Sequence, residues 1–289
     1  MDLFIALALQ IIYGIANLVL ISLGLAIIFG MMRVINLAHG EFIMLGGYTV
    51  VISTNHGVNI WFAMLILAPL VVGLIGVIVE RVLIRFLYGR MVDTLLATWG
   101  LSLVLIGLVT TIFGAQTATT ISAPLGAVKI GDYSTSGYEL FLIAVAIVLS
   151  ILVYLVLRFT KLGLVARGTM QAADMAAALG VSTSRVYAIT FGLGAAVSGF
   201  AGALLAPITG VLPTIGATYI AKAFITVISG GAAILAGTTS ASVLLGGING
   251  IVSFGIGPTM GEVALLVAAI ILLRLMPRGI TGRLFRKSL

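Results

Sequence analysis

Apolar residues occur in long continuous runs along the chain, separated by short polar segments. A membrane-spanning helix needs roughly 17–25 predominantly apolar residues. The runs also lack the period-two alternation that the strands of a membrane β-barrel would show. Candidate spans cover residues 3–30, 42–54, 60–79, 91–114, 139–158, 187–209, 216–235, 239–256 and 261–276. The pattern therefore predicts an all-α polytopic membrane protein with about nine transmembrane helices.

One stretch interrupts this pattern early in the chain. Residues 31–42, MMRVINLAHGEF, place four polar side chains between two apolar runs, and the run that follows is too short to cross a membrane alone. Such an interruption is typical of a discontinuous helix, which is tolerated at membrane depth where it meets protein or water. The alternative is an ordinary cytoplasmic turn at 33–41 in which Asn36 caps the next helix. SGGAAILAGTTSA at 229–241 is a second candidate for a break, so one or two helices are candidates for broken or re-entrant helices.

Composition agrees with a lipid environment. The chain is 61% hydrophobic and 8% charged, whereas soluble domains carry about 25% charged residues. Residues 1–289 are therefore predicted to form a single transmembrane domain. Because there is no cysteine, disulfides and cysteine-ligated metals are excluded, and we predict no metal site. The N-terminus MDLF has no basic segment before the first apolar run, so we expect no cleavable signal peptide.

The net charge of +7 is distributed as in a membrane protein rather than a nucleic-acid-binding protein. One side of the predicted topology receives Arg33, Arg81, Arg85, Arg90, Arg158, Lys161, Arg167, Arg185 and the tail with Arg278, Arg283, Arg286 and Lys287. The other side receives little beyond Lys129. Positively charged loops face the cytoplasm. We therefore expect the N-terminus outside and the C-terminus in the cytoplasm, with 115–138 as an external loop and 159–186 as a cytoplasmic loop.

The acidic residues lie at predicted span ends or in loops, except for Glu41, whose place is ambiguous. Proton-coupled carriers usually hold carboxyl groups well inside their spans, so this distribution argues against a secondary carrier. No catalytic constellation and no phosphate-binding loop G-x-x-x-x-G-K-[ST] occurs. We predict that the chain is not an enzyme and carries no cofactor, and that any nucleotide energy comes from another subunit.

Several residues within or beside the spans are candidates for a solute pathway or a broken helix. They are Gln10, Asn17, Asn36, His39, Glu41, Lys222, Gly230 and Gly231. Gln10 and Asn17 share a helical stripe that faces either a partner subunit or a hydrated cavity. Lys222 either extends to the lipid headgroups or contacts a neighbouring helix or the pathway. His39 is interpreted as a structural hydrogen-bonding residue.

Small residues recur every four positions in two spans and predict close helix packing. The two series are Gly194, Ser198, Gly202 and Ala206, and Thr238, Ser242, Gly246 and Gly250. The cytoplasmic loop contains another feature, QAADMAAALG at 171–180, whose alanines favour a helix that ends near Gly180. This helix is too short and polar to span, and its small face would fit a groove on another protein.

The chain resembles the LivH-type permease subunits of branched-chain amino acid ABC importers, a family that also includes permeases for urea and short amides. The resemblance covers nearly the whole chain. It rests on GLAIIFGMMRVINLAHGEFIMLGGY, TWGLSLVLIGLVTTIFG, TKLGLVARGTMQAADMAAALGVSTSRVYAITFGLGAAVSGFAGALLAP, KAFITVISGG and MPRGITG. The resemblance implies a bacterial inner-membrane permease that works with four kinds of partner. These are the lipid membrane, a second related permease in a heterodimer, two cytoplasmic ATPases that hold ATP and Mg, and a periplasmic binding protein.

The resemblance also implies that the cytoplasmic loop docks on an ATPase. The general importer motif there is E-A-A-x-x-x-G, of which this chain keeps the acid Asp174, Ala176 and Gly180. The ATPase-coupling residues implied are Gln171, Ala172, Asp174, Ala176, Ala177 and Gly180.

The substrate expected from the resemblance is a branched-chain amino acid. FGAQ at 113–116 and LAGT at 235–238 look more like the urea-type relatives, and GGAAILAGTT lacks the Gly-Ser pair of the commoner amino-acid pattern. A urea or short-amide permease is therefore one alternative. A stand-alone channel or secondary carrier, and a structural or signalling scaffold, are alternatives of other classes.

Overall fold

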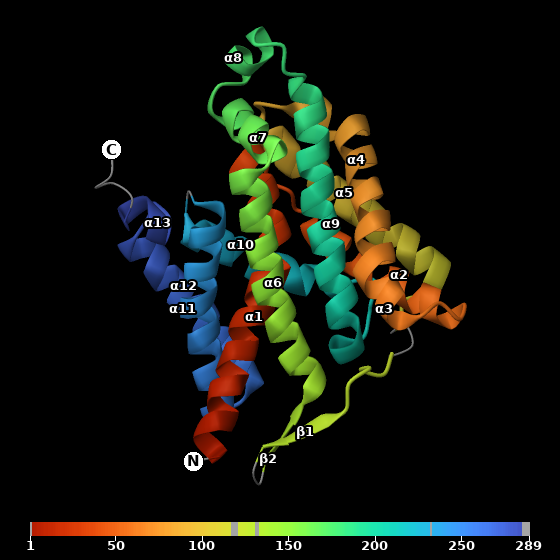
Figure 1. Ribbon diagram of the computed structural model, residues 1–289, viewed down its shortest axis with the longest axis vertical. Coiled ribbons are helices and arrows are strands. Elements are labelled where there is room, and N and C mark those ends of the chain that lie inside the picture. Colours follow the sequence, from red (N-terminus) through yellow and green to blue (C-terminus); the bar gives the residue numbers. More distant parts are fainter. Residues whose placement is uncertain (1, 117–120, 131–132, 232, 285–289) are drawn as a thin grey trace. The chain divides into compact units, whose positions relative to one another are not determined.

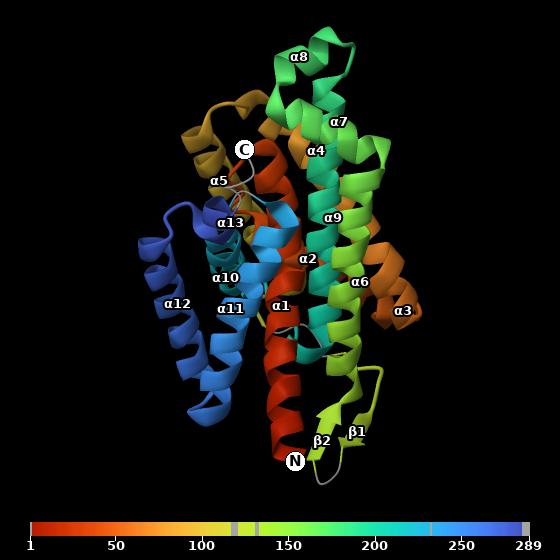
Figure 2. The same cartoon turned by 60° about the vertical axis from the view of Figure 1, so that its left-hand side comes forward.

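The computed structural model describes residues 2–116, 121–130, 133–231 and 233–284 (Figures 1 and 2). The first half contains α1 (Asp2–Met32), α2 (His39–Asn55), α3 (Ile60–Phe62), the π-helix η1 (Ala63–Leu67), α4 (Ala68–Val82), the 3-10 helix η2 (Ile84–Leu87) and α5 (Met91–Phe113). A hairpin of β1 (Ala127–Ile130) and β2 (Tyr133–Ser136) follows. The second half contains α6 (Gly137–Phe159), α7 (Lys161–Gln171), α8 (Ala173–Ala178), α9 (Thr183–Thr209), α10 (Ile215–Gly230), α11 (Ile234–Gly255), α12 (Pro258–Leu275) and α13 (Gly279–Leu284).

The helices confirm an all-α polytopic membrane architecture. Among the described residues, 7 helical segments are long and apolar enough to cross a membrane: Leu7–Met32, Ile60–Val82, Met91–Phe113, Gly137–Phe159, Thr183–Thr209, Ile234–Gly255 and Pro258–Gly282. The remaining predicted spans lie on α2 and α10, which have 17 and 16 residues. At 1.5 Å per residue these two helices are about 26 and 24 Å long, shorter than a hydrocarbon core of roughly 30 Å. The count of nine crossings and the orientation remain predictions.

The β-hairpin lies within the predicted external loop and was not expected from the sequence. Its two strands pair antiparallel, with Ala127 opposite Ser136 and Lys129 opposite Ser134. Gly137 follows β2 directly and begins α6, and its backbone N–H donates to the carbonyl of Gly126. The hairpin thus closes over the first residue of α6.

The chain forms two compact units. Unit 1 comprises residues 1–22, 123–151 and 222–289, and unit 2 comprises residues 23–122 and 152–221. α1, α6 and α10 each contribute residues to both units. The loop at 159–186 and the α1–α2 interruption belong to unit 2.

Helix α9 forms the centre of unit 2, where α2 and α4 pack along it (Figure 1). A Cβ on Gly46 of α2 would lie 2.6 Å from the carbonyl carbon of Gly199, and a Cβ on Gly202 would overlap the backbone of Ile43. Phe42 and Phe191 fill the space beside these glycines, with their rings edge to face and their centroids 6.0 Å apart. The small residues of α9 therefore allow the backbones of α2 and α9 to touch, as their four-residue spacing predicts.

The second series of small residues has the same role in unit 1. A Cβ on Gly246 of α11 would lie 2.8 Å from the Cα of Ile15, and one on Gly250 would lie 2.9 Å from the Cα of Ile11. α11 also runs beside α12, where Gly261 faces the Ser253 side chain (Figure 2). Both predicted packing surfaces are thus used for close contacts between helices.

Candidate functional site

The interruption between α1 and α2 lies in unit 2, where Arg33 is exposed and the polar residues after it, Asn36 and His39, are buried. α1 ends at Met32, the backbone of Arg33 adopts a positive φ of 52°, and α2 begins at His39. Asn36 and His39 are both 0% exposed, and Glu41 is 2% exposed. An exposed turn in the cytoplasm would leave these polar side chains in water. Their burial favours the discontinuous helix over the plain turn.

Hydrogen bonds hold the interrupted backbone against α5. The backbone N–H of Leu37 donates to the Thr98 hydroxyl oxygen at 3.0 Å, and the same hydroxyl lies 3.2 Å from the Ile35 carbonyl oxygen. The Asn36 side-chain oxygen accepts from the Ala38 N–H at 3.1 Å. Asn36 is not the N-cap of α2, because that position belongs to Ala38, which makes no side-chain capping bond. Asn36 instead stabilises the non-helical turn that precedes the helix.

His39 connects the start of α2 to α9. Its Nδ1 lies 3.1 Å from the Ser198 hydroxyl, which also lies 2.8 Å from the Gly194 carbonyl oxygen. Since a hydroxyl has one proton and the carbonyl can only accept, Ser198 donates to Gly194. His39 Nδ1 must then carry the proton that it donates to Ser198. This contact agrees with the interpretation of His39 as a structural residue.

Two buried polar atoms beside the interruption have no hydrogen-bond partner among the described residues. They are Nδ2 of Asn36 and Oε2 of Glu41. The other part of the Glu41 carboxyl group interacts with the Ser102 side chain and with its own backbone N–H. Buried polar groups are normally satisfied, so each exception requires an explanation. A water molecule or a polar solute that reaches this place could hydrogen-bond with both atoms.

A second helix interruption meets the first one within unit 2. α9 ends at Thr209, Gly210 adopts a positive φ of 67°, and α10 begins at Ile215. Gly40 and Gly216 are the second residues of α2 and α10, and a Cβ on Gly216 would lie 2.7 Å from the carbonyl carbon of Gly40. The two short helices thus begin side by side in buried backbone. Helix N-termini carry partial positive charge, so this place suits the carboxylate or carbonyl oxygen of a passing solute.

The loop at 159–186, predicted to be cytoplasmic, contains two helices rather than the predicted single helix at 171–180. Gln171 is the last residue of α7, and Ala172 leaves the helical region with φ −151° and ψ 87°. α8 then covers only 173–178, and Gly180 stops it with a positive φ of 83°. The N–H of Gly180 donates to Ala177, and that of Val181 to Ala176, which satisfies carbonyls at the helix end. The predicted stop at Gly180 is confirmed, whereas the predicted continuous helix is wrong.

α8 presents two large apolar side chains at the surface. Met175 and Leu179, four positions apart, are 64% and 79% exposed, while Ala176 is 8% exposed and faces the protein. Gln171, Ala172, Asp174, Ala177 and Gly180 are also exposed. Figure 1 shows α8 beyond the ends of α7 and α9. Because the other residues around Met175 and Leu179 are small or polar, these two side chains are the apolar contacts that α8 offers to another protein.

The base of this loop is supported by a half-buried tyrosine pair. The rings of Tyr88 and Tyr187 lie 4.6 Å apart, and the Tyr88 hydroxyl donates to the Glu80 carboxylate. Burial raises the pKa of Tyr88, and the hydrogen bond to Glu80 and its charge raise this pKa further. Tyr88 therefore stays protonated at neutral pH and remains a donor. This contact connects α4, η2 and α9 at the end of unit 2 where the loop begins.

The remaining candidate pathway residues lie in unit 1. Lys222 of α10 makes an ion pair with Glu262 of α12, with Nζ and Oε1 2.6 Å apart. Gln10 is exposed, and Oδ1 of Asn17 is buried without a hydrogen-bond partner among the described atoms. The predicted break at 229–241 is shorter than expected, since α10 reaches Gly230 and α11 begins at Ile234.

Gly230, Gly231 and Ala233, near the junction of α10 and α11, contact the start of α13. The Thr281 hydroxyl donates to the Gly230 carbonyl at 2.6 Å and accepts from the Ala233 N–H at 3.3 Å. Gly231, with a positive φ of 85°, lies against the Arg278 carbonyl oxygen and the Cα of Gly279. The candidate residues thus fall into two groups, one around Asn36 in unit 2 and one in unit 1.

Sequence reasoning missed three partners of the candidate residues: Thr98, Ser102 and Ser198, which bind the interrupted segment. Ser198 was interpreted only as a packing residue, and nothing in the sequence marks Thr98 or Ser102. The apolar pair Met175 and Leu179 could have been found, because a four-residue spacing of large apolar residues in an otherwise small and polar loop predicts one exposed face.

Comparison with known proteins gives one family and relatives of the same description. Residues 7–282 match the family described as branched-chain amino acid transport system / permease component. The high-affinity branched-chain amino acid transport system permease proteins LivH of Salmonella typhimurium and Escherichia coli are each 34% identical over 128 residues. Each match covers 44% of this chain and 42% of the relative.

A probable branched-chain amino acid transport permease protein LivH of Methanocaldococcus jannaschii is 28% identical over 230 residues. This match covers 73% of this chain and 70% of the relative. No solved structure matches the chain. The family match extends over nearly the whole chain and includes both helix interruptions and the cytoplasmic loop. The chain therefore belongs to the family of permease components of branched-chain amino acid transport systems, and it is a multi-pass protein of the inner membrane.

Proposed function

We propose that the chain is the permease subunit of an ATP-driven ABC importer that moves a small solute, most simply a branched-chain amino acid, from a periplasmic binding protein into the cytoplasm. It acts beside a second related permease and two cytoplasmic ATPases that bind ATP and Mg. The chain supplies half of a pathway and no motor. Its membrane helices change between two arrangements when the ATPases close.

The observation that carries this proposal is the exposed apolar pair on α8. Met175 and Leu179 expose most of their area to solvent although the helix behind them is packed through Ala176. Burying such a side chain against a partner contributes roughly 1.5–3 kcal/mol. α8 is also anchored at both ends, by α7 and by α9, so that a push on α8 reaches the transmembrane helices.

The second support comes from the α1–α2 interruption. Its polar side chains Asn36, His39 and Glu41 are buried, and one atom each of Asn36 and Glu41 is free to bind a solute or water. The first turns of α2 and α10 meet at Gly40 and Gly216. Irregular backbone with converging helix N-termini is the usual form of a solute site in transporters. We propose that the carboxylate of the solute passes this place.

The docking role is tested with a Met175→Ser/Leu179→Ser double variant of the importer reconstituted with its partner proteins in vesicles. Two anchors lost from an interface cost on the order of 2–4 kcal/mol, so uptake of leucine is expected to fall by about tenfold or more. The folded chain should keep its thermal stability, because both side chains are exposed. Uptake, ATP hydrolysis and melting temperature are measured on the same preparation.

Leu164→Ser is the matched control. Leu164 is also 64% exposed, but it lies on α7 rather than α8. This variant should transport normally. Normal uptake by the double variant, or an equal loss in the control, would refute α8 as the docking element. An Ala177→Asp variant places a charge beside the same pair and should uncouple ATP hydrolysis from uptake.

The solute is tested separately, since the binding protein largely determines specificity. Uptake of labelled leucine, urea and acetamide is compared in the same vesicles. Transport of leucine supports the proposal. Transport of urea or acetamide instead would show that the chain is a urea or short-amide permease of the same family. Uptake by the purified chain without ATPases would overturn the importer mechanism.

A further inference from the structure

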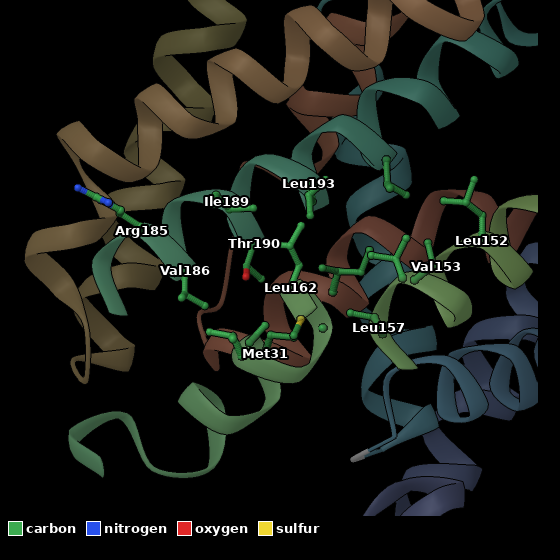
Figure 3. A pocket seen from close by; sticks show the side chains of 16 residues that line it. Met31, Leu152, Val153, Leu157, Leu162, Arg185, Val186, Ile189, Thr190 and Leu193 are labelled. Carbon is green, nitrogen blue, oxygen red and sulfur yellow. The ribbon is translucent and has the colours of Figure 1, made fainter. Parts of the chain in front are cut away.

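An apolar groove of about 160 Å³ lies at the cytoplasmic-loop end of unit 2, apart from the helix interruptions. One wall is α9, with Arg185, Val186, Ile189, Thr190, Leu193 and Val197. The opposite wall is formed by the last turns of α6, by α7 and by Ile27 and Met31 of α1. Figure 3 shows the labelled side chains of α9 facing Leu157, Leu162 and Met31 across the groove. An apolar surface of this kind is favourably covered by hydrocarbon rather than by water.

The groove is open to the surface along its length. Leu152, Leu162, Ile189 and Leu193 line it and are each 43–53% exposed. α6 and α9 are both candidate membrane spans, so this surface faces lipid unless another chain covers it. The lining residues from Arg185 to Val197 extend over twelve positions of α9, or about 18 Å. One leaflet of a bilayer has a hydrocarbon depth of about 15 Å.

Basic residues lie in the lining of the groove or next to lining residues in the chain. Arg185 is itself a lining residue, and Figure 3 shows its guanidinium group directed away from the apolar walls. Arg158, Lys161 and Arg167 are the chain neighbours of the lining residues Leu157, Leu162 and Ala166. The only acid between residues 152 and 190 is Asp174, on α8. The groove thus combines a hydrocarbon-lined slot of leaflet length with a set of basic residues in or next to its lining, Arg158, Lys161, Arg167 and Arg185, called its cationic mouth.

We infer that this groove binds one anionic phospholipid of the cytoplasmic leaflet. One acyl chain lies between α6, α7 and α9, and the phosphate group lies beside Arg185 and Lys161. The narrow slot fits a hydrocarbon chain better than a protein helix, whose diameter with side chains is about 10–12 Å. The positive mouth selects anionic over zwitterionic headgroups. Because α7 forms part of the wall and leads into α8, the bound lipid holds the cytoplasmic loop in place.

The binding site is tested by placing a fluorophore beside the groove. The chain contains no cysteine, so Leu155→Cys gives a single labelling position on α6 that is 48% exposed and lies next to the lining residue Val156 without being part of the lining. The labelled full chain, with any partners that copurify, is mixed into vesicles that contain phosphatidylglycerol or phosphatidylcholine with the same brominated acyl chains. Phosphatidylglycerol is expected to quench the fluorophore at a mole fraction about tenfold lower.

Two further variants separate the slot from the mouth. Ala166→Trp fills the slot and should abolish the selective quenching, whereas Leu164→Trp, on α7 but outside the lining, should leave it unchanged. Arg185→Gln/Lys161→Gln should remove most of the preference for phosphatidylglycerol, since each cation contributes to it. Arg274→Gln, on α12, is the charge control. Melting temperatures exclude misfolding, and Val186→Trp serves as a second slot-filling variant.

Several results would overturn the inference. Equal quenching by the two lipids would show an ordinary lipid annulus without a site. Unchanged selectivity in both the slot-filling and the Arg185→Gln/Lys161→Gln variants would place the lipid elsewhere. Cross-linking from Val186→Cys to another protein chain, with no lipid quenching, would show that a subunit covers the groove. None of these readouts depends on transport, so a failure here is distinct from a failure of the proposed function.

Discussion

The tip of the cytoplasmic loop and the α1–α2 interruption are opposite kinds of site within the same unit. α8 has six residues and exposes Met175 and Leu179, and its stop glycine has open space around it. The interruption has Asn36 and His39 fully buried, and the glycine at its helix start touches the backbone of Gly216. One site is built to contact something outside the chain, and the other is built into the packing.

This difference predicts which property a substitution changes at each site, partner contact or folding stability. At the exposed positions Met175 and Leu179 a side chain can change without disturbing the fold, so the effect falls on partner contact. At the interruption a single added methyl group meets backbone atoms, so the effect falls on folding first. The two sites therefore separate coupling from stability.

The largest effect is expected from Gly46→Ala in α2. The new Cβ would lie 2.6 Å from the carbonyl carbon of Gly199, so α2 and α9 would have to separate. Such overpacking costs about 3 kcal/mol. The melting temperature in detergent and the fraction of monodisperse protein should both fall. The control is Gly100→Ala in α5, where a Cβ meets nothing within 4 Å. A control that destabilises as much as Gly46→Ala would contradict the packing argument.

A smaller loss is expected from Tyr88→Phe, which keeps the ring and removes the hydroxyl. Glu80 is 0% exposed and its Oε2 already lacks a partner among the described residues, so the carboxyl would lose its remaining hydrogen bond. Leaving such a group unsatisfied costs about 1–3 kcal/mol. Thermal unfolding measures it, and Tyr154→Phe, on the surface of α6, is the control.

The same contact has a defined dependence on pH. The pKa of Tyr88 is raised above its usual value of about 10 in the folded chain. A group with a raised pKa stabilises the fold fully below the unfolded value, and this contribution is lost as pH rises through the folded value. The wild-type advantage over Tyr88→Phe should therefore be constant from neutral pH to about pH 10. A decline already below pH 9 would contradict the assigned hydrogen bond.

An intermediate effect is expected for the accessibility of Asn36. If the interruption lines the pathway, Asn36→Cys should react with a small water-soluble thiol reagent at a rate that changes about tenfold between the nucleotide-free and ATP-bound importer. Ser53→Cys, buried further along α2, is the comparison position. A rate that is high and independent of nucleotide would indicate an open cytoplasmic turn.

The smallest effect is expected at the Lys222–Glu262 ion pair. The Lys222 side chain is 23% exposed and that of Glu262 53% exposed, so solvent screens the pair. Exposed ion pairs contribute about 0–1 kcal/mol. Lys222→Gln should therefore change the melting temperature little. A strong loss of uptake in this variant at unchanged stability would assign Lys222 to the pathway.

The coarse architecture could be predicted from the sequence, because long continuous apolar runs in lipid form transmembrane helices. Each predicted span overlaps a helix, and both series of small residues are packing surfaces. Contacts between distant segments were not predictable. Thr98 and Ser198 follow α1 by many residues, and only the fold shows that they bind the segment at Leu37 and His39.

The local backbone geometry of the loop also could not be predicted from the sequence. The alanine-rich segment at 171–180 favours a helix throughout by propensity. Ala172, between α7 and α8, nevertheless has a non-helical backbone. Tertiary context overrides a propensity difference of less than 1 kcal/mol per residue. The contact between Gly40 and Gly216 likewise depends on how α2 and α10 are packed. Local sequence patterns do not predict this packing.

The most direct test of the account is a cross-link from α8. Leu179→Cys, the only cysteine in the chain, is combined with single cysteines on the surface of the partner ATPase in the assembled importer. The account predicts a cross-link whose yield changes with nucleotide, together with no uptake by the chain alone. A cross-link that forms only from the control Leu164→Cys, or solute uptake without any ATPase, would contradict it.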